Sequence, residues 1–405
     1  MNRPIPIVLR TAWTAMALGP LAACSDRTGP IRPDLEAVAR ADSYLGVDAG
    51  KQPFTLYTQN VYLGGDTGPI FSLDFNDIPA LLQATNVFWA QVQHSNIAER
   101  AAAVVDEIDA RRPHVVGLQE VFRFAVVDAT TGAVVDGADI LAAIQDEIVA
   151  RGLPYEVVRV QENTSAALPL AIDFGTMSIT EALAFTDRVV ALRRTDVSLT
   201  ASDQGTYATR FSLGPVTLKR GWIRLSVDFD GQAYNFVTTH LETQGLAPVQ
   251  AGQAQELLDQ VVEGLEGITI VSGDLNSDAA AEEGAPSWTP TYDLLRSAGF
   301  ADAWLLSPHK RRDAGFTCCQ DPDLVNHLSI LDERIDHVLI RTSGKSGKSG
   351  KSTRVAGAVK VEIVGEEIAD LTPGGLWPAD HAGLVAGLRL AKGATGKSRK
   401  DQAGR

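Results

Sequence analysis

Short runs of β-forming residues recur along this chain, and many of them end in an acid, an amide or a histidine. Runs of roughly four to eight such residues are typical of buried strands. Some follow one another directly and others flank segments with helical spacing, which favours an α/β fold of mixed sheets covered by helices. The predicted strands span 54–59, 115–118, 155–160, 188–192, 222–229, 234–239, 268–272 and 335–340. The predicted helices lie near 97–108, 250–263 and 290–298, and Pro113 ends the first of them.

Six segments place polar side chains at or just beyond the ends of predicted strands. Open α/β sheets usually hold ligands at the carboxyl ends of their strands, so these segments are candidates for one shared site. A single acid at a strand end is more often a turn or cap residue, and each segment alone therefore indicates little. The segments are Gln59-Asn60, Gln119-Glu120, His240-Leu241-Glu242, Gly273-Asp274-Leu275-Asn276, Arg334-Ile335-Asp336 and Asp380-His381.

Two of these segments constrain their side chains further. Gly273 permits close backbone approach, and Asp274 and Asn276 face the same side if their segment is extended. An Asx turn is the alternative, because these residue types also favour it. Asp380 and His381 point to opposite faces if they are extended. A histidine paired with an aspartate on another strand makes a workable acid or base, because the carboxylate fixes its tautomer and supports its charged form.

In this order, the six segments resemble the endonuclease/exonuclease/phosphatase family. That family includes pancreatic-type deoxyribonucleases, repair exonucleases, neutral sphingomyelinases and inositol polyphosphate 5-phosphatases. The resemblance runs from about Phe54 to Leu390, which is nearly the whole mature chain. It implies a four-layered α/β sandwich, in which two mixed β-sheets pack face to face and are flanked by helices, with the site at one end.

The resemblance also implies a metal centre. Asn60 and Glu120 would hold Mg²⁺, or Mn²⁺ in its place, and Asp380 would lie close to the metal. This donor set is chemically sensible, because Mg²⁺ prefers hard oxygen ligands and takes one or two carboxylates together with waters and a substrate phosphate.

The remaining matched residues would carry the catalytic step. By the same resemblance, His381 paired with Asp336 would be the catalytic histidine, while His240, Asp274 and Asn276 would orient the water and the phosphoryl oxygens. Attack on a phosphodiester needs a metal to neutralise developing charge and a positioned base for water. The sequence leaves both His381 and Asp274 open as that base.

Arg188 starts a predicted strand and is a candidate substrate-binding residue. An arginine there can bind phosphate, bidentately if it is well placed. The alternative is a salt bridge with Asp187 or another acid. The sequence favours phosphate binding and a salt bridge equally.

The N-terminus resembles a bacterial export signal. Positive charge from two arginines precedes a small and apolar stretch, which predicts a signal peptide over residues 1–23. Leu21-Ala22-Ala23-Cys24 looks like a lipobox, so Cys24 is the expected lipidation site and 24–52 the lipidated N-terminus and tether. The protein is then exported and lipid-anchored in the cell envelope, at the outer membrane or cell surface. A plain cleaved signal, giving a periplasmic or secreted protein, is the alternative.

By the family resemblance, residues 53–391 are expected to form an endonuclease/exonuclease/phosphatase domain, and 392–405 a disordered basic tail. A Gly-Lys-Ser repeat over 344–352 lacks the spacing of a phosphate-binding loop, and a flexible basic surface loop is expected there. Cys318 and Cys319 are adjacent, which excludes a disulfide between distant segments. They form either a vicinal disulfide or two loop thiols.

The formal net charge of −14 bears on the substrate. Non-specific nucleic-acid binding draws most of its free energy from a positive field, which this chain lacks. The family resemblance implies a divalent-metal-dependent phosphoesterase, and with the export signal and the acidic charge we expect it to hydrolyse a phosphodiester outside the cytoplasm, either a lipid headgroup or a small phosphodiester. An extracellular or periplasmic nuclease is one alternative, and a non-catalytic lipoprotein binding module on the same fold is another. The anchor implies a membrane as partner, and nothing implies a protein partner.

Overall fold

The computed structural model describes residues 52–214, 216–308, 314–342 and 357–390. The predicted signal peptide, the lipidation site Cys24, almost all of the predicted tether, the Gly-Lys-Ser repeat and the basic tail lie outside these residues. The described residues fall in the second of two units of the chain, Val47–Arg405. Within them, no helix combines the length and apolar character needed to cross a membrane.

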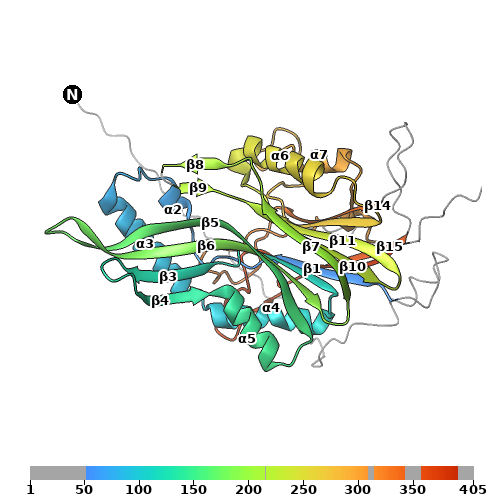
Figure 1. Ribbon diagram of the computed structural model, residues 1–405, viewed down its shortest axis with the longest axis horizontal. Helices are drawn as coiled ribbons and strands as arrows, with labels where there is room; N and C mark the ends of the chain where they lie inside the picture. Colours follow the sequence, from blue (N-terminus) through green and yellow to red (C-terminus); the bar gives the residue numbers. More distant parts are fainter. Residues whose placement is uncertain (1–51, 215, 309–313, 343–356, 391–405) are drawn as a thin grey trace, which may run out of the picture. The chain divides into compact units, whose positions relative to one another are not determined.

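Two mixed sheets form the centre of the described structure (Figure 1). In spatial order the first sheet contains β15 (Gly357–Val364), β16 (Gly383–Leu390), β1 (Phe54–Asn60), β2 (Val115–Gln119), β6 (Ser178–Arg194), β3 (Arg123–Asp128) and β4 (Val134–Asp139), while β5 (Tyr155–Asp173) pairs with β6. The second contains β13 (Ala301–Asp302), β14 (Asp336–Thr342), β12 (Ile268–Asp274), β11 (Gln232–His240), β10 (Gly221–Phe229) and β7 (Ser198–Thr206). A small separate ribbon consists of β8 (Phe211–Leu213) and β9 (Val216–Leu218).

Along the chain, the helices lie in the segments that connect these strands. The α-helices are α2 (Gly68–Phe71), α3 (Ile78–His94), α4 (Ile97–Arg111), α5 (Ile140–Ala150), α6 (Ala247–Glu256), α7 (Thr291–Ser297) and α8 (Ala303–Leu306). Shorter turns of helix are η1 (Gln244–Leu246), η2 (Leu257–Val261), which continues α6 in a π conformation, and η3 (Ile368–Asp370).

Alternating side chains divide the apolar residues of the sheets between separate cores. In β6, Val189 and Ala191 pack in the core between the two sheets, whereas Val190 and Leu192 pack in the core beneath α4 and α5. A third core joins the outer face of the second sheet to α6 and α7. Figure 1 shows these two pairs of helices on opposite sides of the strands. The predicted four-layered α/β sandwich of two mixed sheets is confirmed.

The predicted strands and helices lie where they were expected, but some of them extend further along the chain than predicted. Strand 155–160 extends to Asp173 and strand 188–192 begins at Ser178, so β5 and β6 form one long hairpin that reaches beyond the helices in Figure 1. Several register shifts interrupt the pairing of β5 with β6. These irregularities break the two-residue alternation by which a strand is recognised in sequence.

Candidate active site

Strand register brings three predicted site residues side by side in the second sheet. His240 on β11 lies opposite Asp274 on β12, which in turn lies opposite Asp336 on β14. All three side chains are buried. Neighbouring strands lie about 4.8 Å apart. This register therefore places Asp274 in the middle of the row, one strand from His240 on one side and one strand from Asp336 on the other.

The first sheet contributes amide groups that meet this row. Asn60 ends β1 opposite Gln119 of β2, and its Nδ2 donates to Asp274 Oδ2 at 3.0 Å. Gln119 Nε2 donates to Thr238 Oγ1 of the facing sheet at 2.9 Å. The ends of the two sheets are therefore joined by side-chain hydrogen bonds at the site itself.

His381 completes the group from the residues just before β16. Its Nδ1 lies 2.8 Å from Asp336 Oδ2, and its Nε2 lies 4.0 Å from Asp274 Oδ2. Burial disfavours a charged imidazole, but the carboxylates of Asp336, Asp380 and Asp274 outweigh that effect and raise the pKa of His381 well above its ordinary value. These carboxylates therefore favour the charged form of the ring, in which Nε2 carries a proton.

Asp274 is positioned by a local turn as well as by its strand. Gly273 has φ +126°, and a Cβ there would meet the Thr239 carbonyl oxygen at 2.1 Å, so only glycine fits before Asp274. Asn276 N–H donates to Asp274 Oδ1 at 2.8 Å, which is an Asx turn. A role in the site and an Asx turn are therefore compatible interpretations of this segment, because the turn itself lies within the site. Burial and the charge of Asp336 raise the pKa of Asp274 to about 6.

His240 is held neutral. Burial, Arg220 and His381 together lower its pKa well below the ordinary value. Its Nδ1 lies 3.0 Å from Arg220 Nη1, and its Nε2 lies 3.3 Å from Asp274 Oδ2 and 3.1 Å from Asn276 Nδ2. Arginine and the amide nitrogen are both donors, so a single neutral ring cannot accept from both.

Glu120 and Asp380 form the oxygen-rich side of the site. Glu120 has φ +55°, and its Oε2 accepts from Leu63 N–H at 3.0 Å. Burial raises its pKa, while His381 and the Asn60 amide oppose the rise. Burial and the charge of Glu120 raise the pKa of Asp380 to about 7 against the opposing charge of His381.

This side has the character of a divalent-cation site. Asp380 Oδ1 is buried and has no hydrogen-bond partner among the described residues. A buried carboxylate oxygen without a donor, next to a second carboxylate that repels it, is stabilised by a bound cation. Asn60, Glu120 and Asp380 therefore fit Mg²⁺ or Mn²⁺. Ligand atoms of Asp274, Asp336 and His381 also lie within 4.8 Å of one another, but Asp336 is already bound to the imidazole.

Arg188 is not brought to this group. It shares the side of β6 on which Val190 and Leu192 face α4 and α5, whereas Asp187 faces the second sheet. Its guanidinium donates to the carbonyls of Val121 and Phe122 and forms a salt bridge with Asp139, the N-cap of α5. The structure thus favours the ion-pair interpretation of Arg188, with Asp139 rather than Asp187 as the acid.

Sequence reasoning missed Arg220. It precedes β10 without any motif, and only its neighbour Gly221 marks a place where strands approach closely. It also missed the contact between Cys319 and the site. Cys318 and Cys319 are disulfide-bonded, and Cys319 Sγ lies 3.8 Å from His381 Nε2.

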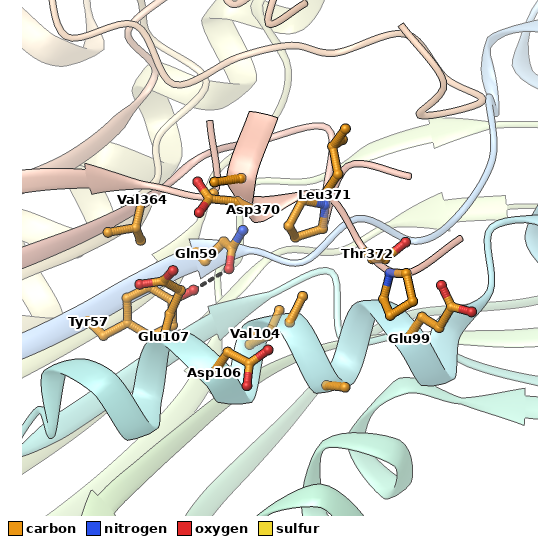
Figure 2. Close-up of a pocket in the computed structure, with 16 residues that line it drawn as sticks. Tyr57, Gln59, Glu99, Val104, Asp106, Glu107, Val364, Asp370, Leu371 and Thr372 are labelled. Carbon is orange, nitrogen blue, oxygen red and sulfur yellow. Dashed lines mark hydrogen bonds between the residues drawn. The ribbon is translucent and has the colours of Figure 1, made fainter. Parts of the chain in front are cut away.

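A cavity of about 220 Å³ lies apart from these residues, between α4, β1 and the segment after β15 (Figure 2). Figure 2 shows Tyr57 bonded to Gln59 at its wall, below Asp370. Gln59 Nε2 donates to the His381 carbonyl at 3.1 Å. Of the six candidate segments, Gln59 reaches this cavity, and its bond to the backbone of His381 connects the cavity wall to the site.

Solved structures match this chain at low identity and with TM-scores below 0.5. No family model matches the chain, and no curated protein matches it. An endonuclease/exonuclease/phosphatase family protein from Leptotrichia buccalis is 15% identical, with a TM-score of 0.47, over 84% of this chain and 100% of that one.

Two further similar structures come from other organisms. An endonuclease/exonuclease/phosphatase from Beutenbergia cavernae is 18% identical, with a TM-score of 0.48, over 84% of this chain and 72% of that one. TDP2 of D. rerio, solved with a single-strand DNA product, is 17% identical, with a TM-score of 0.47, over 84% and 100%. The chemistry of the site therefore follows from the residues of this chain and not from these similarities.

Proposed function

We propose that this protein is a divalent-metal-dependent phosphoesterase that hydrolyses a phosphodiester. The observation that carries the proposal is the meeting of an oxygen-rich group, Glu120 and Asp380, with a charged His381–Asp336 pair. A cation and an imidazolium at one site are the two charges that a phosphoryl group needs as it is attacked.

The metal would be held by Asn60, Glu120 and Asp380. When bound, it would neutralise the charge that develops on the phosphoryl oxygens and orient the substrate. A cation held in the site would supply positive charge directly at the phosphate. The reaction would then not depend on the long-range field of the chain, whose formal net charge is −14.

The protein's own side chains divide the proton transfers between them. Asp274, with a pKa of about 6, is ionised at neutral pH and accepts the proton of the attacking water. His381 keeps its proton because of Asp336 and donates it from Nε2 to the leaving oxygen. Asn276 and His240 direct N–H groups toward Asp274 and the phosphoryl oxygens. This division favours Asp274 over His381 as the base.

The substrate we favour is a lipid headgroup or a small phosphodiester outside the cytoplasm. The acidic chain gives no support for extended contact with a polyanion. The lipobox ending at Cys24 supports anchoring at a membrane, where such headgroups are abundant. Loss of membrane attachment without loss of activity in Cys24→Ala is the expected test of the anchor, and a variant that still partitions with detergent would contradict lipidation.

The activity is tested on purified mature protein with Mg²⁺ or Mn²⁺ against sphingomyelin vesicles, inositol phosphates, DNA and RNA. We expect release of a phosphate product that a chelator abolishes. Glu120→Ala and His381→Ala should each stay folded and lose at least about a hundredfold in turnover. Turnover near that of the unmodified protein in either variant would refute the assignment, and no turnover on any diester would favour a binding module.

A further inference from the structure

Arg220 lies among three polar side chains, those of His240, Asp187 and Glu242. Its Nη1 lies 3.0 Å from His240 Nδ1 and 3.8 Å from Asp187 Oδ2, and its Nη2 lies 3.3 Å from Glu242 Oε1. Its side chain is 16% exposed, and those of Asp187 and Glu242 are 3% and 1% exposed. The chain thus places a fixed positive charge between two buried carboxylates and a histidine of the site.

The backbone is shaped to hold the arginine there. A Cβ on the next residue, Gly221, would lie 2.5 Å from Asn163 Oδ1 and 2.7 Å from the Gly205 carbonyl oxygen. Asn163 Nδ2 in turn donates to Asp187 Oδ2 at 3.1 Å. Glycine at 221 therefore lets the start of β10 approach Asn163, which orients one carboxylate partner of Arg220.

A guanidinium has five N–H donors and no acceptor, and it keeps its proton at any pH at which the protein is folded. His240 Nδ1 must therefore be the unprotonated acceptor. In a neutral ring, the hydrogen is then on Nε2, the nitrogen that faces Asp274 Oδ2. The nearby Asn276 Nδ2 has its own acceptor, the Leu241 carbonyl at 3.1 Å, so it does not need Nε2.

We propose that Arg220 is a positioning residue that fixes His240 in its neutral Nε2–H tautomer. His240 then serves as a permanent donor toward Asp274 and a bound phosphoryl oxygen, and it is barred from acting as a second base. The tautomer itself requires no substrate. Only its consequence for turnover rests on the proposed phosphoester hydrolysis.

The alternative is that Arg220 merely neutralises Asp187 and Glu242. The two roles differ in what they predict for the ring of His240. A purely neutralising charge leaves the tautomer to other neighbours, whereas a bond to Nδ1 determines it.

The test is the protonation of His240 nitrogens by ¹⁵N NMR on the full mature chain labelled at histidine, with His240→Gln to assign the signals. In the unmodified protein we expect Nδ1 unprotonated and Nε2 protonated. Arg220→Lys, which keeps a charged donor, should preserve this state. Arg220→Met should lose it, so that Nδ1 gains a proton.

Folding of the methionine variant is protected by a paired substitution. Arg220→Met with Glu242→Gln removes one buried carboxylate together with the cation and isolates the bond to Nδ1, with Glu242→Gln alone as its control. A proton on Nδ1 in the unmodified protein would overturn the proposal. So would an unchanged Nε2–H tautomer in the folded double variant.

Turnover supplies the second measurement. We expect kcat to fall at least tenfold in the methionine variants with KM little changed, and to recover in large part in Arg220→Lys. If the tautomer behaves as expected but no diester is hydrolysed even by the unmodified protein, the proposed function fails and the role of Arg220 at His240 stands.

Discussion

His381 Nδ1 lies 2.8 Å from Asp336 Oδ2, and this contact joins a histidine that precedes one sheet's β16 to the first residue of the other sheet's β14. It fixes both the orientation and the charge of the ring. The other ring nitrogen, Nε2, lies 4.0 Å from Asp274 Oδ2. A proton donor and a proton acceptor are thus placed on opposite sides of one small space.

Asp336→Asn should remove the charge that does most to favour protonated His381. The pKa of His381 falls, because among the neighbouring carboxylates Asp336 raises it most. We expect kcat to fall by about 10²–10⁴, the usual contribution of a positioned proton-transfer group. Steady-state kinetics at several pH values measure it, and Asp203→Asn, an exposed carboxylate paired with Arg224, is the matched control. Equal losses in the two variants would contradict the assigned role.

Activity should depend on pH with two limbs. Asp274 must be ionised, so the rate falls as pH drops through about 6. His381 must be protonated, so the rate also falls as pH rises through its own raised pKa. A pH profile of kcat/KM measures both limbs. An acid limb that persists unchanged in Asp274→Asn, measured on its residual activity, would show that another group is the base.

Metal binding should stabilise the protein more at alkaline than at acidic pH. The pKa of Asp380 is raised to about 7, so its ionisation destabilises the metal-free fold as pH rises through that value. A divalent cation binds the ionised form and offsets the repulsion from Glu120. We expect the rise in Tm on adding Mg²⁺ to be larger at about pH 8 than at about pH 5, since protons compete with the metal. Glu120→Gln with Asp380→Asn should abolish the rise at both.

Arg188→Met should weaken the fold and spare the chemistry. The arginine binds Asp139 and two carbonyls, and removing one partner of a largely buried pair costs about 3 kcal/mol or somewhat less where the acid is partly exposed. Urea unfolding measures that cost, and kinetics on the folded fraction should show an unchanged KM. A raised KM with unchanged stability would restore Arg188 as a phosphate ligand.

Gly273→Ala should destabilise the protein by about 3 kcal/mol or more, because the new methyl group meets the Thr239 carbonyl at 2.1 Å in a left-handed conformation. Gly231→Ala is the matched control. Gly231 also has a positive φ, +68°, but nothing lies within 4 Å of its Cβ position. A comparison of urea midpoints separates the cost of the clash from that of the backbone conformation. Equal midpoints would mean that the clash is relieved by movement of β11.

The sequence predicted five strands whose ends carry the site, β1, β2, β11, β12 and β14, because their apolar runs are short and clear, but it did not predict β16, which follows His381. Asp274 follows such a run, and its strand is β12 as expected. The partner of Arg188 was not predictable, since it depends on which face of β6 lies beneath α5, and on Asp139 far along the chain. Arg220 was missed for the same reason, because its three contacts come from residues that only the folded sheets bring together.

The shared register of β11, β12 and β14 makes the proposed catalysis depend on the folding of the second sheet. A slip of β12 by one residue would replace Asp274 with Gly273 beside His240 and turn the carboxylate toward the helices. We therefore expect a protein whose second sheet is only partly assembled to have no activity. Recovery of turnover after dilution from denaturant should follow protection of the β12 backbone amides from hydrogen exchange, which makes activity a direct measure of correct strand pairing.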